Sequence, residues 1–557
     1  MPGIPKRLSR FWKELRQRRV IRVLVVYVAV GFAVIEFVDI VTEPLSLPVW
    51  TLTLVIILVS AGLPLALIFA WAFDITPQGI KRTDFSDSTQ DEKVLNGLNS
   101  IVILPFEDMS PEKDNEYSCD GITEEIINAL TKIEDLYVVA RTSAFAFKGQ
   151  SIDVREIGNK LGVKTLLEGS VRKAGDQLRI TAQLINIETG YHLWSERYDR
   201  QLSDIFEIQD EISMQIVNKL KISSKPREEK ILARRYTGNL EAYNLYLKGR
   251  YFWNRLTEEG LHKSLDFFRQ AIRIDPDYAL AFSGISDAYC RLAWYSYTAP
   301  GEVFPRAKEA AEKALKIDDH LPEAYASLGF VSMCFDRDYG KAMKEMKKAI
   351  DLNPGFSGAR TYYSICLAIT GMHEESITEG KRALELDPLT PMMYVNLGGR
   401  YYYARQYELC IENVKQSFEL DPEFNIVHFY LAYFYNQWKK HAEAIAEIQK
   451  LIGHFGRSNP TFLSILAIIL ASSGNTKAAE EVIDEITELS KKKYISFFWL
   501  ATIYVVVGQY DIAFELFEKA YQTHEVLMIF LNVDPIFDRI KPDQRFQALL
   551  RKMNFIQ

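Results

Sequence analysis

The chain has 557 residues, too many for one hydrophobic core, so several domains are expected. Hydrophobic residues make up 48% and charged residues 25%, an ordinary mixture that excludes wholesale disorder. The net charge of −7 argues against nucleic-acid binding, which usually needs a basic surface. Five cysteines form no CxxC pair, so we interpret them as small buried residues rather than metal ligands or disulfide partners.

The amino-terminal 73 residues have the pattern of a transmembrane helical hairpin. A basic segment, 1–19, precedes two apolar stretches within 20–73, each near the ~20 residues that a helix needs to cross a bilayer. The first stretch is too long for a cleaved signal peptide. Because basic residues stay on the cytoplasmic side, we predict a multi-pass protein of the cell inner (cytoplasmic) membrane with its soluble domains in the cytoplasm.

Small residues at Gly62, Ala66 and Ala70 form a stripe on the second apolar stretch. Such stripes let membrane helices pack closely. We predict packing of the hairpin on itself, and a homo-oligomer is the open alternative. The polar, turn-rich segment 74–99 follows as a linker.

Residues 100–222 have the alternating pattern of a small α/β domain. Short apolar runs of buried-strand type alternate with amphipathic helical stretches, and turn signals separate the last three strands. The expected order is β-α-β-α-β-β-β-α, which predicts a mixed sheet covered by helices. The strands are expected at 101–106, 136–140, 165–171, 177–187 and 191–198, and the helices at 121–133, 154–161 and 205–220.

Three stretches of this domain resemble the TolB-like amino-terminal domain family. They read IVILPFEDMSPEKDNEYSCDGITEEIINAL, LLEGSVRKAGDQLRITAQLINIETGYHLWSERYDR and DIFEIQDEIS, and the match covers about residues 98–222. The resemblance implies an α/β module for protein assembly or sensing, not a known catalyst. In relatives of this architecture the module lies between an output domain, a cyclase or a winged-helix DNA reader, and tetratricopeptides. Only about 20 residues precede the first apolar stretch, so neither output domain is expected here.

Five acidic residues cluster around the first strand-to-helix connection: Glu107, Asp108, Asp120, Glu124 and Glu125. Carboxylates there could hold a divalent cation or line a ligand crevice. We favour helix capping and solubility, and we expect no metal and no cofactor. The chain also lacks phosphate-binding loops, HExxH, GxSxG and the kinase motifs, so we predict that it is not an enzyme.

The second half of the chain carries an internal repeat. Asp-Pro or Asn-Pro steps recur every 34 residues, at Asn353-Pro354, Asp387-Pro388 and Asp421-Pro422. Small residues recur in register before each step and let two antiparallel helices approach, while the proline ends the second helix. This pattern resembles a tetratricopeptide array. We expect about eight repeats over 236–533, an all-α superhelix, and a capping segment at 534–557.

Tetratricopeptide arrays bind partners in a groove lined by the first helix of each repeat, and here those positions are largely aromatic. An exposed aromatic groove predicts a protein partner held by apolar anchors. Packing between repeats, or contact with the α/β domain, explains the same residues equally well. The predicted groove consists of Phe330, Met333, Tyr402, Tyr403, Phe429, Tyr433, Asn436 and Phe498.

These patterns together predict a multidomain protein: two transmembrane helices, a small α/β domain with a mixed sheet, and an all-α tetratricopeptide superhelix. The leading functional hypothesis is a membrane-anchored, non-catalytic scaffold that recruits protein partners through its repeats and binds no nucleic acid. The alternative is a sensory or regulatory subunit in which the TolB-like domain binds a ligand and signals through the repeats.

Overall fold

The computed structural model describes residues 27, 30–32, 34–38, 48, 50–76, 79–82, 99–112, 115–222, 236–491 and 495–556. The chain divides into two compact units, Met1–Gly97 and Leu98–Gln557, and each is described by itself. In the first unit, helix α3 (Trp50–Ala72) leads into an antiparallel pair of short strands, β1 (Phe73–Thr76) and β2 (Gly79–Arg82). The hydroxyl of Tyr27 donates a hydrogen bond to the carbonyl of Val59 at 3.0 Å, which holds an earlier helical segment against α3.

No helix within the described residues is long and apolar enough to cross a membrane. The predicted fold class, with two transmembrane helices in 20–73, and the predicted localisation as a multi-pass inner-membrane protein with cytoplasmic domains are therefore wrong. A span needs about 20 successive apolar residues in one helix. The first predicted span is described only in pieces, and the side chains of α3 are described only as far as Gly62.

A six-stranded mixed sheet forms the centre of the α/β domain, with the order β5-β3-β6-β7-β8 and β4 paired to β6. Strand β3 runs parallel to both β5 and β6, whereas β6, β7 and β8 are antiparallel. The bounds are β3 (Asn99–Ile103), β4 (Glu107–Asp108), β5 (Leu136–Val138), β6 (Thr165–Ala174), β7 (Gln177–Asn186) and β8 (His192–Gln201).

Two helices, α5 (Glu116–Leu130) and α8 (Ile205–Lys219), pack against each other and against the sheet. Ile122 and Ile126 of α5 and Ile208 of α8 are completely buried, because isoleucines spaced four residues apart share one face of a helix. The short helices α6 (Arg141–Phe145) and α7 (Val154–Leu161) follow β5, and η1 (Leu202–Asp204) leads into α8. The sequence predicted α7 and α8 closely and missed α6.

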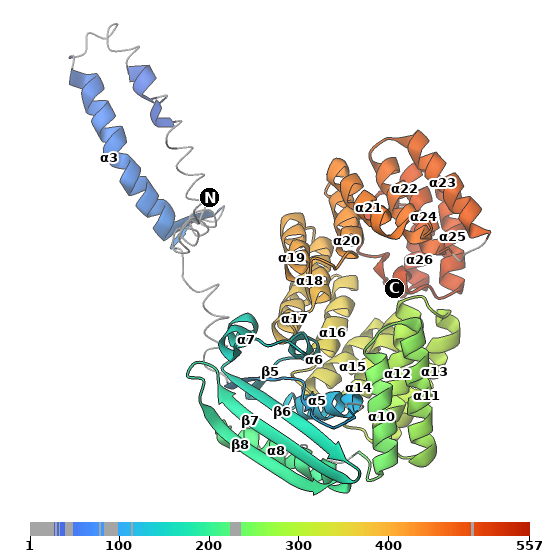
Figure 1. Ribbon diagram of the computed structural model, residues 1–557. Helices are drawn as coiled ribbons and strands as arrows, with labels where there is room; N and C mark the ends of the chain where they lie inside the picture. Colours follow the sequence, from blue (N-terminus) through green and yellow to red (C-terminus); the bar gives the residue numbers. More distant parts are fainter. Residues whose placement is uncertain are drawn as a thin grey trace. The chain divides into compact units, whose positions relative to one another are not determined.

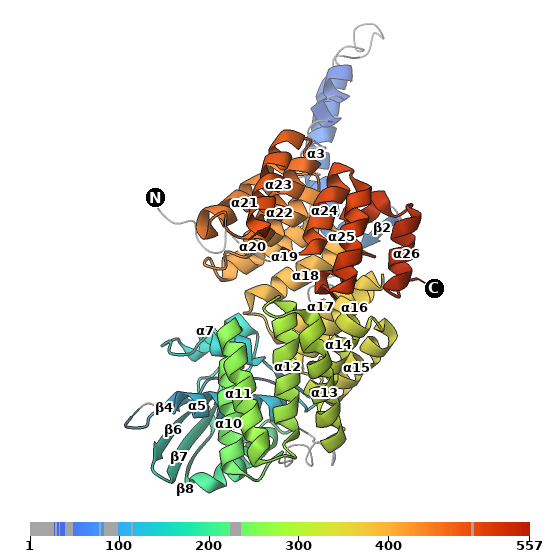
Figure 2. The ribbon, with the colours of Figure 1, turned by 90° about the vertical axis from the view of Figure 1, so that its right-hand side faces the viewer.

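From α10 onward the described helices form consecutive antiparallel pairs (Figures 1 and 2). In order they are α10 (Leu240–Trp253), α11 (Glu258–Ile274), α12 (Ala279–Trp294), α13 (Pro300–Ile317), α14 (Pro322–Val331), the π-helical turn η2 (Ser332–Asp336), α15 (Tyr339–Leu352), α16 (Ser357–Ile369), α17 (His373–Leu386), α18 (Pro391–Tyr403), α19 (Tyr407–Leu420), α20 (Val427–Gln437), α21 (His441–Phe455), α22 (Pro460–Ser472), α23 (Thr476–Ser490), α24 (Phe497–Val507) and α25 (Tyr510–Gln522).

The proline steps end the second helices of successive repeats. Asn353, Asp387 and Asp421 are the C-cap residues of α15, α17 and α19, and each leaves the helical conformation immediately before its proline. Beyond α25, the turns η3 (Val526–Phe530) and η4 (Pro535–Ile540) lead to α26 (Gln544–Lys552). Phe546, Leu549 and Leu550 of α26 are buried, and the helix contacts α25 at the end of the array (Figure 2).

Adjacent glycines in α18 provide a matched test of repeat packing. A Cβ on Gly398 would lie 2.4 Å from Val414 Cγ2 and 3.1 Å from the carbonyl oxygen of Cys410, whereas a Cβ on Gly399 meets nothing within 4 Å. We expect Gly398→Ala to lower the free energy of unfolding by about 1–3 kcal/mol through overpacking. Gly399→Ala should be neutral or stabilise by up to about 1 kcal/mol, because alanine favours the helix. Urea denaturation of both variants measures this difference, and equal effects would contradict the close contact.

Candidate functional site

Two of the predicted groove residues lie in the third helix pair and are buried there. The Phe330 ring centroid is 4.8 Å from that of Tyr362 and 5.5 Å from that of Trp294, and Phe330 is 1% exposed. Met333 lies in η2 and is fully buried. The Phe330 ring therefore packs between the neighbouring first helices α12 and α16.

Two further predicted residues, Tyr402 and Tyr433, hold a buried carboxylate. Their hydroxyls donate hydrogen bonds to the two oxygens of Asp534, each at 2.7 Å, and the backbone N–H of Ile536 donates to Asp534 at 3.1 Å. Asp534 is only 3% exposed. Burial raises the pKa of Asp534 above its ordinary value, although the three donors oppose this shift.

The remaining predicted residues contact the same carboxyl-terminal segment or a neighbouring repeat. The half-buried Tyr403 stacks on Phe530, with ring centroids 5.3 Å apart, and the buried Phe498 lies 5.8 Å from Phe537. The contacts of Phe330 with Trp294 and Tyr362 correspond to the alternative that the sequence left open, packing between repeats, whereas the contacts with the carboxyl-terminal segment were not predicted. Partner binding through the predicted groove residues stays a prediction.

Phe429 and Asn436 complete the predicted set. The ring of Phe429 is half-buried and lies 6.1 Å from the ring of Trp499. The buried amide of Asn436 donates to the hydroxyl of Ser472 at 3.2 Å, and its oxygen lies 3.0 Å from Nδ1 of His441. Phe429, like Tyr403, is therefore a predicted anchor whose ring stays partly accessible.

The carboxyl-terminal segment also returns to the middle of the array. The Asn554 side chain donates to the carbonyl of Arg337 at 3.1 Å, and the ring of Phe555 stacks on that of Tyr339 with centroids 4.6 Å apart. Asn532 donates to the carbonyl of Ile369 at 3.0 Å. These contacts join residues far apart in the sequence, so no local pattern could have revealed them.

The α/β domain packs on the first repeats through the proline-step residues. Asp387 accepts hydrogen bonds from the hydroxyls of Thr142 and Ser143 in α6, each at 2.5 Å. One repeat earlier, the side-chain amide of Asn353 donates to Thr131 Oγ1 at 3.2 Å. Asp387 and Asn353 are 2% and 4% exposed, so these bonds lie in a closed interface.

Glu124 of α5 adds an ion-pair network to the same interface. Its carboxylate contacts Arg250 of α10 at 2.7 Å and Arg141 of α6 at 2.8 Å, and it accepts a hydrogen bond from Asn254 at 3.3 Å. Burial opposes ionisation of Glu124, but the two arginine charges outweigh it and hold its pKa below the ordinary value. The sequence interpretation of Glu124 as a solubilising residue missed this role.

The other predicted acidic residues do not converge on one point. Asp120 pairs with Lys148 at 2.6 Å, and Asp108 accepts backbone N–H groups of Ser110 and Asn115, both at 2.9 Å. Glu107 is exposed. Within the described residues, the single group of side chains close enough to share a metal ion is Asp318, Asp319 and His320, of which only Asp318 is buried.

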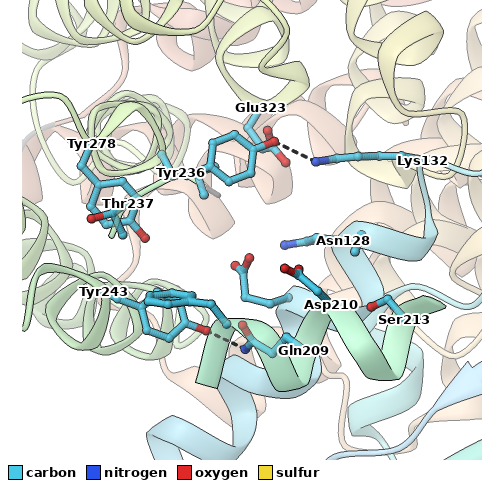
Figure 3. A pocket seen from close by; sticks show the side chains of 14 residues that line it. Asn128, Lys132, Gln209, Asp210, Ser213, Tyr236, Thr237, Tyr243, Tyr278 and Glu323 are labelled. Atoms are coloured by element: carbon cyan, nitrogen blue, oxygen red, sulfur yellow. Dashed lines mark hydrogen bonds between the residues drawn. The ribbon is translucent and has the colours of Figure 1, made fainter. Parts of the chain in front are cut away.

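Figure 3 shows a small cavity, of about 70 Å³, between the α/β domain and the first repeats. Lys132 extends across it and donates to the hydroxyl of Tyr236 at 2.9 Å, beside Glu323. Glu125 also lines this cavity. Burial and the charge of Glu124 raise the pKa of Glu125 to about 7.

A larger cavity of about 240 Å³ lies between α5, α6 and the first helices of the early repeats. Its lining includes Arg291 and Asp287 together with Glu124 and Arg250, so both signs of charge face it. The Ser283 hydroxyl, on the same wall, has no hydrogen-bond partner among the described residues. The charged and hydroxyl-bearing lining is suited to a polar molecule.

No family model matches the chain. It is 42% identical over 187 residues to the putative adenylate cyclase 3 of Rhizobium meliloti, which corresponds to 34% of this chain and 32% of that protein. It is 20% identical over 298 residues to the transcriptional regulator HilA of Salmonella typhimurium, or 52% of this chain and 51% of that one. The chain therefore spans a third to a half of the length of these curated relatives.

Two solved structures of tetratricopeptide repeat proteins are similar to part of this chain. YrrB, a TPR protein with an unusual peptide-binding site, is 21% identical, covers 36% of this chain and 96% of its own, and has a TM-score of 0.24. A tetratricopeptide repeat protein from Parabacteroides merdae is 12% identical, covers 49% of this chain and 99% of its own, and has a TM-score of 0.35. The assignment of tetratricopeptide-type repeats here depends on the helix pairs described above.

Asp387 and Asp421 occupy the same position in successive repeats and allow a matched test of the interface. Asp387 accepts bonds from α6, whereas Asp421 accepts the backbone N–H of Glu423 in its own turn. We expect Asp387→Ala to lower the free energy of unfolding by about 1–3 kcal/mol, because Thr142 and Ser143 lose a buried acceptor. It should also speed hydrogen exchange in α6. Asp421→Ala should leave α6 unchanged, and equal exchange in both variants would contradict the docking role.

Asp534 should make stability depend on pH. A raised pKa in the folded state means that the fold favours the protonated carboxyl. The contribution of Asp534 to the free energy of unfolding is therefore greatest at pH values below the pKa of an unfolded-state carboxyl group. That contribution is lost as pH rises through the raised folded-state pKa. Urea denaturation across this range should show the wild type losing stability relative to Asp534→Asn, which cannot titrate. If the difference between their free energies of unfolding stays constant, or if the wild type gains stability relative to the variant as pH rises, the raised pKa of Asp534 is contradicted.

Proposed function

We propose that this chain is a non-catalytic scaffold that recruits protein partners through its tetratricopeptide repeats. The observation that supports the proposal is that the first helices of the repeats already hold protein segments of the same chain. Helices α5 and α6 pack on the early repeats, and the segment around Asp534 packs on the later ones. A surface that binds polypeptide within the chain has the shape and chemistry to bind it from another chain.

The predicted groove residues remain part of this proposal. Most are buried by the chain itself, so a partner would first meet the half-buried rings of Tyr403 and Phe429. Aromatic anchors of this kind often carry most of the binding free energy of an interface. Residues such as Tyr402 would become accessible only if the carboxyl-terminal segment moved aside, because its hydroxyl is bonded to Asp534.

We further propose that residues 100–222 are a TolB-like module that fixes the early repeats in one arrangement. The stretches that resemble this family supply strand β3, helix α5 and the hairpin β6–β7. The ion pairs of Glu124 connect the module to α10, so the module acts as a fixed part of the scaffold. The names of the relatives describe those proteins, and neither cyclase activity nor DNA reading is proposed for this chain.

A second candidate is a sensory or regulatory subunit whose TolB-like module binds a ligand and signals through the repeats. The 240 Å³ cavity favours this function, because both the module and the repeats line it. The Oδ1 atom of Asn353 and the Ser283 hydroxyl have no hydrogen-bond partner among the described residues and lie in residues that line this cavity. A polar ligand there would contact both parts of the chain at once.

Affinity capture with the full-length chain tests the scaffold. We expect Phe429→Ala to weaken capture of specific partners at least tenfold, because it removes an apolar anchor. The matched control is Phe418→Ala, an aromatic on the second helix α19 that is 40% exposed, which should capture the same partners as the wild type.

If Phe429→Ala captures partners as well as the wild type does, partner binding through the predicted groove is contradicted. If capture then responds instead to Ser283→Val, which replaces a hydroxyl of the cavity between the module and the repeats with an apolar group, the regulatory function replaces the scaffold. Thermal denaturation of each variant shows whether a change in capture follows from loss of the fold.

A further inference from the structure

Strand β8 forms the outer edge of the six-stranded sheet (Figure 1). It is ten residues long, and its outer side pairs with no other strand among the residues that the structure describes. Within β8 only Tyr198 is buried, and the charged residues around it are exposed. An edge of this length presents a row of backbone N–H and C=O groups to which another strand can bind.

The charges of β8 are arranged symmetrically about Tyr198. Arg197 and Asp199 flank it on either side, and Glu196 and Arg200 lie one position further out. An antiparallel pair of identical strands has a two-fold axis, so with Tyr198 on that axis Arg197 of one copy lies opposite Asp199 of the other. In the same register Glu196 lies opposite Arg200. All four charged positions then face an opposite charge.

We propose that β8 pairs antiparallel with β8 of a second copy of this chain, centred on Tyr198, so that the two sheets become continuous. This dimer goes beyond the proposed scaffold function and does not depend on the partner groove. It would present two repeat arrays on one particle.

The charges of β8 favour the register centred on Tyr198 over neighbouring registers. A register with its axis between two residues is excluded, because the backbone groups that face one edge, and the side chains on one face, belong to alternate residues. Centring the pair on Arg197 or on Asp199 places that charge opposite itself. Like charges directly opposite each other destabilise strand pairs, so the register centred on Tyr198 is favoured over these neighbours.

Within one copy, charged side chains of β8 form ion pairs but remain exposed to solvent. Asp199 contacts Arg179 at 2.5 Å and Arg197 at 3.0 Å, and Arg200 contacts Glu211 at 3.2 Å. The side chains of these pairs are 40–63% exposed, so they stay accessible to a second strand. Charges on an edge strand can instead serve to prevent association, and a monomeric wild type is the outcome that this alternative predicts.

Complementary charge reversal tests the register. Arg197→Asp leaves two acids at positions 197 and 199, and Asp199→Arg leaves two arginines there, so each variant repels a copy of itself. Mixed in equal amounts, the two variants restore both opposite-charge pairs. In sedimentation equilibrium of the full-length chain we expect a wild-type dimer, at least tenfold weaker self-association of each variant, and recovery in the mixture.

The control is Arg172→Asp, which reverses an exposed charge on the interior strand β6 and should leave the dimer unchanged. A wild type that is monomeric at all concentrations, or single variants that associate as strongly as it does, would overturn the proposal.

Cross-linking gives a second measurement that leaves the charges intact. In the proposed register Ser195 of one copy lies opposite Gln201 of the other. A mixture of Ser195→Cys and Gln201→Cys should form a covalent dimer with a short bis-maleimide, and each variant alone should not. The five native cysteines are buried and should not compete. No cross-link in the mixture, or equal cross-linking of each variant alone, would contradict the register.

Discussion

The side chains of Asn353 and Asp387 connect the repeat period to the position of the α/β domain. Each ends the second helix of a repeat, and the proline that follows prevents the helix from continuing. Each also bonds to the α/β domain, Asn353 to Thr131 and Asp387 to Thr142 and Ser143. Because both residues are buried, their polar groups need these partners. Asn353 and Asp387 therefore both end helices of the repeats and hold the α/β domain against the array.

A second constraint comes from the first helices of the later repeats, whose aromatic side chains need cover from water. The chain's own carboxyl-terminal segment supplies much of it, through Phe530 against Tyr403 and Phe537 against Phe498. Asp534 is buried in that segment at a cost that the hydroxyls of Tyr402 and Tyr433 offset by hydrogen bonding. Parts of the array are thus covered by the same chain, the early repeats by α5 and α6 and the later ones by this segment.

Local periodicity predicted the elements of the α/β domain well where their patterns were long. The predicted helix 205–220 corresponds to α8, and the predicted strand 177–187 corresponds to β7. Helix α6 was missed because five residues, RTSAF, are too short to show a helical period. The fold class was wrong in its transmembrane part, because apolar composition alone was taken to show a spanning helix. The exposed aromatic groove was only one of two interpretations, and most of its residues are buried.

The sequence by itself determined the period of the repeats, since a proline after each Asn353, Asp387 or Asp421 ends a helix whatever surrounds it. It also predicted the longer strands and helices of the α/β domain through their apolar spacing, but not the short elements β4 and α6. Only the tertiary structure decided what covers the first helices of the array. Tyr402 meets Asp534 at a separation of 132 residues, and Glu124 meets Arg250 at 126. Contacts of that kind depend on how whole elements pack, and no local pattern of residue types encodes them.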